Sequence, residues 1–376
     1  MAGLLTILLA GAAGSPGSAA VAAREAGTAR PLLAYAAGNR IVVVDKHGTV
    51  LTRVRRGIGG FALGGRLLAK GYVTDHGART VGYDARRGDV LFRVTQTLRI
   101  PTVLRSGRAV AFSGQGKRDP YATSLWLRNG AGHERQLIQF SFGKGAPGIP
   151  TGMTEGYVLD YSFDSAADVA AVVGGDDYAG FHYDIWVVDV RDGGYARLTT
   201  GQRSRFPAVA PGGARVAYFR EKAVCGGPMP GWRAGDLVVV DTDGTHRGVV
   251  DGGDCNSYLD RPRWLSDDVL VAVQHTRRPG SDPDPLYDAQ LVLVDVASGL
   301  VSDPIGATDR VGDVSVSASL ARIAYTDWTQ PKGFWVFRWT PGDPADPGAW
   351  VQGTTHRFDV GRVPHLRDDP TLIPSY

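Results

Sequence analysis

The stretch from Asp184 to Glu221 constrains the fold of this chain more than any other segment. It carries four short β-strand signals in succession, over residues 185–190, 196–200, 206–210 and 215–220. The turns between them contain Asp and Gly, which favour tight turns because Asp bonds the backbone ahead and Gly accepts positive φ. Four short antiparallel strands in about 40 residues are typical of one sheet in an all-β repeat protein.

The wording of this stretch carries a family resemblance. Residues 184–189 read Asp-Ile-Trp-Val-Val-Asp, 197–199 read Arg-Leu-Thr, 207–213 read Pro-Ala-Val-Ala-Pro-Gly-Gly and 216–218 read Val-Ala-Tyr. These segments resemble the repeat of the TolB-like (WD-like) β-propeller superfamily. The chain departs from that pattern at Ala-Pro-Gly-Gly, where the family has Ser-Pro-Asp-Gly. The resemblance implies an all-β fold: a single β-propeller built of four-stranded antiparallel blades.

The same pattern can be laid over most of the chain. Writing the strands of a blade as a, b, c and d from the axis outwards, we expect seven groups. They lie at residues 32–55, 61–95, 101–140, 157–200, 206–250, 261–305 and 314–353, and one further strand lies at 358–363. The first group lacks strand a, so pairing it with the last strand would close the first blade with strands from both termini. The prediction is one propeller domain over 31–366, with seven blades or alternatively six, followed by a tail at 367–376.

Residues near the end of each strand c recur about every 49 residues, within the range of propeller repeats. They are Asp45, Asp84, Asn129, Asp189, Asp241, Asp295 and Trp339. We interpret the carboxylates among them as turn-capping groups rather than metal ligands or catalytic acids. The tryptophans on strands, Trp126, Trp186, Trp264 and Trp335, are interpreted as packing between blades.

Residues 1–23 are predicted to be a signal peptide. An apolar core at 4–13 is followed by Val21 and Ala23, which suit the −3 and −1 positions of a cleavage site. The core is too short for a membrane-spanning helix, which needs about 20 residues. No Lys or Arg precedes the core, so the alternative is a disordered Ala/Gly tail. The expected location is secreted or in the cell envelope, with no transmembrane span after signal removal.

The only cysteines, Cys225 and Cys255, lie in Gly-rich segments. In an exported chain a disulfide between them is the economical interpretation, and two free thiols are the alternative. No metal-ligand spacing is present, so neither a metal nor a cofactor is predicted. Acidic clusters at 174–178 and 281–285 lack the spacing of a calcium loop.

Composition excludes some partners. The chain contains 51 Gly and 22 Pro, which suits many turns, and its formal charge is only +3. So balanced a charge gives no reason to expect nucleic-acid binding. Only six of the 41 basic residues are lysines. We interpret this arginine excess as a reflection of genome composition rather than as a site.

Connection lengths predict where a ligand would bind. The a–b and c–d turns are short, whereas the long connections are mostly b–c and d–a, which emerge on the same face of a propeller. We call this the long-loop face and the opposite one the short-turn face. Elaborated loops on a rigid scaffold commonly carry binding sites. The candidate ligand-binding residues are Arg118, Tyr121, Asp176, Asp177, Tyr178, His182, Trp232, Arg233, His275, Arg277, Arg278, Tyr287 and Trp328.

Motifs for catalysis are missing from the sequence. It contains no Gly-x-Ser-x-Gly elbow, no His-Glu-x-x-His, no phosphate loop and no dinucleotide fingerprint. We therefore expect a binding or scaffold protein that recognises a peptide, a protein partner or an envelope glycan, without catalysis of its own. The alternative is a secreted polysaccharide hydrolase or lyase acting on the same face, which needs two carboxylates across a cleft. A third hypothesis is a purely structural domain related to peptidase propellers.

Overall fold

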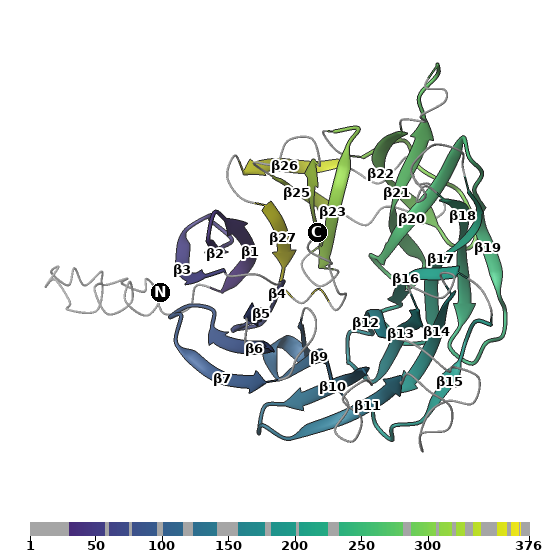
Figure 1. The fold of residues 1–376 in the computed structure, drawn as a ribbon. Coiled ribbons are helices and arrows are strands. Elements are labelled where there is room, and N and C mark those ends of the chain that lie inside the picture. The colour runs from purple at the N-terminus through teal and green to yellow at the C-terminus, as the bar shows by residue number, and fades with distance from the viewer. Residues whose placement is uncertain are drawn as a thin grey trace, which may run out of the picture.

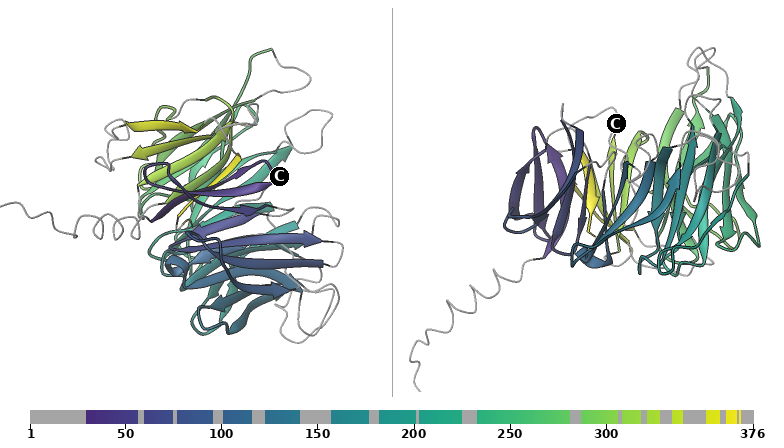
Figure 2. Two further views of the ribbon diagram at one scale, coloured as in Figure 1. Left: turned by 90° about the vertical axis from the view of Figure 1, so that its left-hand side faces the viewer. Right: turned by 60° about the horizontal axis from the view of Figure 1, so that its bottom comes forward.

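A computed structural model describes most of the chain. The described residues are 30–56, 60–74, 77–95, 101–115, 123–140, 157–176, 182–200, 203–224, 233–280, 287–305, 308–317, 321–327, 334–339, 352–358, 362–367 and 369. They form β-strands with a single short 3-10 turn, η1 (Arg105–Gly107). The strands make antiparallel sheets that stand side by side in a ring (Figure 1). Each sheet runs between the two faces of the ring (Figure 2). The all-β propeller expectation is confirmed.

Three sheets have four strands in chain order. The first is β4 (Phe61–Gly64), β5 (Leu67–Thr74), β6 (Gly77–Asp84) and β7 (Val90–Thr95). The second is β8 (Thr102–Leu104), β9 (Ala109–Gln115), β10 (Thr123–Asn129) and β11 (Glu134–Phe140). The third is β23 (Val311–Ser317), β24 (Arg322–Asp327), β25 (Phe334–Trp339) and β26 (Gln352–Phe358).

The middle of the chain forms one larger sheet and one smaller one. Two four-stranded groups are joined by a single parallel bridge between Tyr183 and Arg203. They are β12 (Tyr157–Phe163), β13 (Val169–Asp176), β14 (His182–Asp189) and β15 (Tyr195–Arg197), then β16 (Arg203–Val209), β17 (Arg215–Val224), β18 (Arg233–Asp241) and β19 (Gly248–Gly252). The smaller sheet is β20 (Ser257–Trp264), β21 (Val269–Arg277) and β22 (Tyr287–Asp295), extended by a bridge from Val294 to Val301. The strand groups follow the expected order, and the blade count stays a prediction.

The remaining sheet joins the two ends of the described chain. Its order is β27 (Arg362–Leu366), β1 (Pro31–Ala37), β2 (Arg40–Asp45) and β3 (Val50–Arg55). Leu366 pairs with Leu33, and both side chains are fully buried. The backbone N–H of Leu366 also donates to the Ser315 hydroxyl at 2.9 Å. Closure by strands from both termini is therefore confirmed, and β27 lies beside β1 in Figure 1.

Several strand ends differ from the sequence prediction. The closing strand was expected at 358–363 but lies at Arg362–Leu366, because β26 continues to Phe358 against β25. Residues 221–224 and 233–236 were expected in a loop. They extend the β17–β18 hairpin as far as the pair Val224 and Arg233. Backbone pairing with a neighbouring strand overrides the turn-like composition at these positions.

The core lies between neighbouring sheets. Trp126, Trp186, Trp264 and Trp335 are all buried, which confirms their role in packing. The indole N–H of Trp264 donates to the Ala208 carbonyl at 2.8 Å and so links β20 to the preceding sheet. Side chains alternate between the faces of each strand, so adjacent sheets share interdigitated apolar layers.

The segment at 184–199, which resembles the family repeat, has a structural role. The buried carboxylate of Asp184 pairs with Arg197 and accepts a hydrogen bond from the Thr199 hydroxyl at 3.1 Å. That hydroxyl oxygen in turn accepts the Ile185 backbone N–H at 2.9 Å. The Arg197 guanidinium also lies 5.7 Å from the Trp186 ring centroid. These contacts fix Leu198 and Thr199 against β14 without an outer strand of full length.

The aspartates near the strand-c ends cap turns, as expected. Oδ1 of Asp45 accepts the backbone N–H groups of His47 and Thr49 at 2.8 and 2.9 Å. Asp189 accepts the N–H of Arg191 in the same way at 2.7 Å. These carboxylates satisfy turn N–H groups that have no strand partner. They are therefore structural residues of the short-turn face.

Candidate functional site

Most of the expected long-loop residues cannot be placed. Seven of the named residues lie outside the described residues: Arg118, Tyr121, Asp177, Tyr178, Trp232, Trp328 and Cys225. Three others, Asp176, His182 and Arg233, lie at the ends of β13, β14 and β18, on the side of the long-loop face, where the structure gives the backbone only. Their roles, and the disulfide from Cys225 to Cys255, stay predictions.

His275 is one of four named candidates whose surroundings are described. It lies near the end of β21, 8% exposed, and its Nε2 is 3.1 Å from Oδ1 of Asp260. Burial alone would raise the pKa of Asp260. The charge of His275, its hydrogen bond, and the charges of Arg261 and Arg205 together lower that pKa. His275 and Asp260 therefore form a buried pair inside the sheet rather than a loop contact.

Aromatic rings hold this pair in place. The Tyr258 ring stacks on His275 with centroids 4.7 Å apart and meets Tyr287 edge-on at 5.8 Å. The Tyr287 hydroxyl donates to the Cys255 carbonyl at 2.9 Å. Tyr287, a named candidate, is thus 5% exposed and ties β22 to the segment before β20. Burial raises the pKa of Tyr258 above its ordinary value.

The two named arginines at the end of β21, Arg277 and Arg278, make contacts at the edge of the sheet. Arg278 donates from Nε to Oδ1 of Asp288 at 2.6 Å, and its Nη2 is 3.8 Å from Oδ2 of Asp309. Arg277 donates its backbone N–H to the Asn256 carbonyl at 2.8 Å and so extends the β20–β21 pairing at the end away from its turn. These residues brace the rim of the long-loop face on the side of β21 and β22.

A charged group nearer the axis was missed by the sequence analysis. The innermost strands β16, β20 and β23 each contain a β-bulge, between Arg205 and Ala208, Asp260 and Arg263, and Val311 and Val314. A bulge re-aims side chains because two residues face one on the partner strand. We call the resulting group the axial cluster, and its members are Arg205, Asp260, Arg261, Arg263, His275 and Asp313.

Backbone strain accompanies two of these bulges. Phe206 and Arg261 have φ of 53° and 50°, although neither is glycine. Such a conformation costs about 1–3 kcal/mol and persists where the surroundings impose it. Here Arg261 donates from Nη1 to the Gly312 carbonyl at 2.8 Å, across to the next sheet. Its guanidinium also lies 5.7 Å from the Phe206 ring centroid in the preceding sheet.

Electrostatics distinguish the acidic members of the cluster. Burial raises the pKa of the Asp313 carboxyl, and Arg261 and Arg263 only partly oppose this. Burial also raises the pKa of Glu221, beside the cluster, against the opposing charge of Arg205, whose Nη1 lies 3.3 Å from Oε1 of Glu221. Carboxyls with raised pKa values next to arginines can exchange protons or accept hydrogen bonds from a polar ligand.

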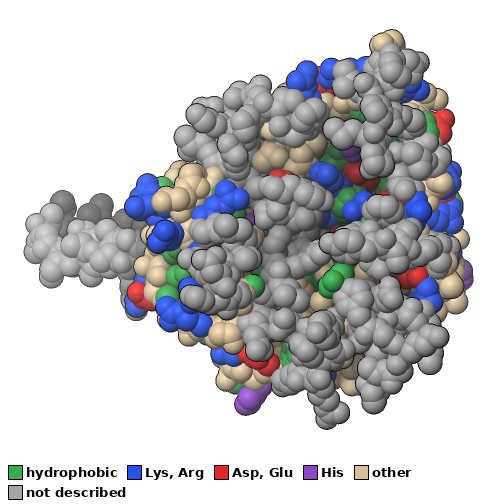
Figure 3. Space-filling view, in the orientation of Figure 1, with side chains coloured by type: hydrophobic (Ala, Val, Ile, Leu, Met, Phe, Trp, Pro, Cys, Tyr) green, Lys and Arg blue, Asp and Glu red, His purple; other side chains and the backbone are tan. Residues whose placement is uncertain are grey.

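The cluster opens toward the inside of the ring. Arg205 lies near the start of β16, at the long-loop end, and its side chain is 43% exposed. Figure 3 shows basic, acidic and histidine side chains together in the hollow beside β20 and β23. Within the described ranges, no group of three or more His, Cys, Asp or Glu is arranged to hold a metal ion. The arginines and carboxyls of the cluster themselves can recognise charge and exchange protons.

Comparisons with known proteins bear on the fold. No protein-family model matches the chain, and no curated protein matches it. Solved structures do. The tricorn protease matches at 13% identity and a TM-score of 0.58, over 89% of this chain and 34% of that one. Oligogalacturonate lyase in complex with manganese matches at 14% identity and a TM-score of 0.54, over 80% of this chain and 76% of that one.

The match that decides the fold is the β-propeller domain of the Trilobed protease from Pyrococcus furiosus. It has 10% identity and a TM-score of 0.51, over 81% of this chain and 85% of that one. This protein has a β-propeller fold. Putative TolB from Agrobacterium tumefaciens also matches, at 15% identity and a TM-score of 0.44, over 73% of this chain and 87% of that one. The Pyrococcus propeller is described as having an open velcro topology, whereas here β27 and β1 pair directly.

One sequence signal would have pointed to the axial cluster. Two inner strands of the propeller repeat a charged residue, one further residue and then proline, as Arg205-Phe-Pro207 and Asp260-Arg-Pro262. Proline suits a bulge because it donates no ladder hydrogen bond. A charged residue just before such a bulge is placed near the propeller axis. The strands expected from the sequence began at residues 206 and 261, so Arg205 and Asp260 fell just before them, whereas β16 and β20 begin at Arg203 and Ser257.

Within the described ranges, no helix is long and apolar enough to cross a membrane. The predicted signal peptide at 1–23 and most of the tail at 367–376 lie outside the described residues.

Proposed function

We propose that the protein is an exported β-propeller that binds a charged peptide, protein partner or envelope glycan on its long-loop face, without catalysis of its own. The observation that supports this most is the axial cluster, in which three neighbouring inner strands present arginines and carboxyls at close quarters. Arg205 is its accessible edge, because the Arg205 side chain is 43% exposed, whereas the side chain of its partner Glu221 is only 4% exposed. Paired charges in a partly desolvated setting favour a ligand of complementary charge pattern.

Rigidity supports a binding role. The His275–Asp260 pair is buried, its tyrosines are packed, and the strained bulge at Arg261 is tied to Gly312. A site that is already ordered loses less conformational entropy when it binds. We infer that the cluster is a preformed floor and that the long loops supply further contacts around it.

Export and the disulfide belong to the same proposal. A bond between Cys225 and Cys255 would join the segment after β17 to the segment before β20. Cys255 is partly buried against the Phe219 and Tyr258 cluster, so its backbone is already held. The intact mass of the mature protein should be lower than that of its reduced form by the thiol hydrogens. An unchanged mass on reduction would contradict the bond.

The test of binding is affinity capture from the envelope fraction under non-reducing conditions, with protein and glycan in the eluate identified by mass spectrometry. Arg205→Gln removes the accessible charge of the cluster and should abolish capture of the specific partner. Arg53→Gln is the matched control, because Arg53 is exposed on the outer strand β3. Equal retention by wild type and both variants would remove the cluster from the proposal.

A second candidate function is a lyase or hydrolase acting on acidic polysaccharide. The observation that favours it is Asp313, since a general acid at neutral pH needs a raised pKa and arginines could bind uronate carboxylates. Oligogalacturonide is the first substrate to try, because the lyase that shares the fold acts on it. The enzyme hypothesis would be favoured if the wild type formed product and Asp313→Asn formed none. No product from the wild type would leave the binding proposal preferred.

A further inference from the structure

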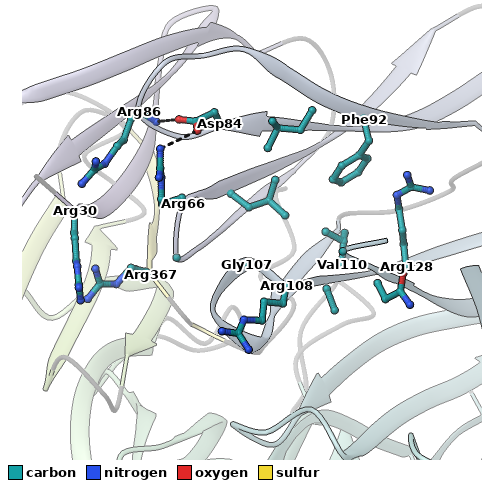
Figure 4. Close-up of a pocket in the computed structure, with 16 residues that line it drawn as sticks. Arg30, Arg66, Asp84, Arg86, Phe92, Gly107, Arg108, Val110, Arg128 and Arg367 are labelled. Carbon is teal, nitrogen blue, oxygen red and sulfur yellow. Dashed lines mark hydrogen bonds and ion pairs between the residues drawn. The ribbon is translucent and has the colours of Figure 1, made fainter. Parts of the chain in front are cut away.

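A cavity on the short-turn face is rich in arginine, which supplies six of its sixteen lining residues. It has a volume of about 840 Å³. Its walls come from the turn between β4 and β5, the turn between β8 and β9, and the strand-c ends of the same two sheets. The arginines that line it are Arg30, Arg66, Arg86, Arg108, Arg128 and Arg367 (Figure 4). Since a–b and c–d turns form it, this cavity lies on the opposite face from the axial cluster and does not depend on the proposed function.

The charge of this cavity is strongly unbalanced. Asp84 is the only acidic residue in the lining, against six arginines, which leaves an excess of five positive charges. The whole chain carries only +3, so the rest of the protein is on balance acidic. The cavity therefore carries a local excess of positive charge that the chain as a whole does not have.

The one carboxylate is already engaged. Oδ1 of Asp84 accepts the backbone N–H groups of Arg86 and Arg87 at 2.9 and 3.0 Å, as a turn cap. Its other oxygen lies 3.4 Å from Nη2 of Arg66, whose side chain is 61% exposed. Asp84 thus holds the turn and neutralises at most one of the arginines. The remaining charge has no carboxylate in the cavity lining to meet it.

Two of the arginines are available for a ligand. Arg108 is exposed just after η1, and no side-chain hydrogen bond or ion pair is found for it in the described part of the chain. The same holds for Arg30, which is exposed at the start of the described chain. Figure 4 shows the guanidinium ends of Arg30 and Arg367 next to each other on one wall. Like charges placed together in this way favour binding of an anion between them.

The rest of the wall is ordered and partly apolar. The Arg128 guanidinium lies 4.9 Å from the Phe92 ring centroid and donates to the Gly132 carbonyl at 2.9 Å and to Glu134 at 3.1 Å. The floor is tight, because a Cβ on Gly107 would come within 2.6 Å of the Gly64 carbonyl oxygen. Leu67, Leu91 and Val110 add apolar surface. The cavity therefore combines ordered walls with exposed cationic side chains.

We propose that this cavity binds a small organic anion that carries at least two phosphate or carboxylate groups. Its volume falls within the range of about 300–1,000 Å³ that is usual for small-molecule sites. Guanidinium groups bind phosphate and carboxylate through paired N–H donors. Because the arginines lie on different walls, one ligand with two anionic groups satisfies more of them than a single anion does. The apolar wall beside Phe92 accommodates the carbon part of the ligand.

The experiment is calorimetric titration of the full chain at low ionic strength, with inorganic pyrophosphate and citrate as the two probes. Tighter binding of pyrophosphate would assign a phosphate ligand, and tighter binding of citrate would assign a carboxylate ligand. Arg108→Gln should lower the affinity for the more tightly bound probe by about tenfold or more, since a charge-assisted hydrogen bond is lost. Arg30→Gln, on another wall, should weaken it as well.

Arg93→Gln is the matched control, because Arg93 is exposed on the same outer strand as Phe92 and does not line the cavity. It removes the same charge from the sheet next to that of Arg108, so the affinity of this variant for the probe should change by less than about twofold if only direct contacts count. The proposal would be overturned if neither probe bound. It would also be overturned if Arg93→Gln weakened binding as much as Arg108→Gln, because the effect would then come from the overall positive charge rather than from contacts in the cavity.

Discussion

The closure of the ring by β27 makes a quantitative prediction. Leu366 is fully buried and packs with Leu33, Tyr35, Ala324 and Val336, so it joins strands from both ends of the chain to β24 and β25. Truncating such a side chain to Ala removes its burial and leaves a cavity, at a cost of about 2–5 kcal/mol. A typical domain is stable by only about 5–15 kcal/mol. Leu366→Ala should therefore remove a large share of the total stability.

The assay is urea-induced unfolding followed by tryptophan fluorescence. Leu300→Ala is the matched control, since Leu300 is 51% exposed and the chemical change is identical. The control should stay within about 0.5 kcal/mol of wild type, as exposed substitutions usually do. Leu366→Ala should move the midpoint to clearly lower urea. If both variants lost the same small amount, the closing strand would not stabilise the ring and the reasoning would be refuted.

Three further predictions concern the long-loop side of the molecule. Burial raises the pKa of the Asp313 carboxyl, so the stability of the wild type falls as pH rises from the ordinary pKa near 3.8 through the higher pKa of the folded state. Asp313→Asn should therefore melt at a higher temperature than wild type at pH 7 and at the same temperature at pH 3. A lower melting temperature of the variant at pH 7 would contradict this. The pKa of Asp260 is lowered, so its ionised form stabilises the folded state at neutral pH. Asp260→Asn should therefore cost about 1–3 kcal/mol of stability at pH 7, by loss of the bond to His275, and this cost should shrink as pH falls below 3.8. A cost that does not change with pH in thermal melts would contradict the assignment. Tyr287→Phe should cost about 0.5–1.5 kcal/mol in urea unfolding by losing its bond to the Cys255 carbonyl, and an unchanged midpoint would show that this bond adds nothing.

Tertiary pairing explains where strand boundaries departed from the sequence prediction. Cys225 is followed by Gly-Gly-Pro, which reads as a loop, yet the hairpin before it extends to the pair Val224 and Arg233. Likewise β21 and β22 pair as far as Arg277 and Tyr287. Hydrogen bonds to a neighbouring strand decide such ends, and the neighbour cannot be read from local composition.

The chain's own pattern determined its architecture. Alternating apolar strands and Asp- and Gly-containing turns allow few arrangements other than small antiparallel sheets, and Asp184, Arg197 and Thr199 hold each other locally, so their spacing alone indicates a blade. The missing first strand and the spare last one likewise predicted closure, because an unpaired strand edge must be covered. These features depend on residues close together in the sequence, or on the rule that every strand edge needs a partner, and both can be recognised from the sequence alone.

Only the tertiary structure decided which charges meet. Arg205, Arg261 and Asp313 come together because bulges turn three inner strands toward one axis. Arg30, Arg108 and Arg367 share a cavity because the ring brings residues 30 and 367 beside the β4–β7 and β8–β11 sheets. Their separations in sequence carry no trace of this proximity. His275 was selected from the sequence as a loop residue, and the structure places it in a buried pair, because burial is set by the sheet packed against it.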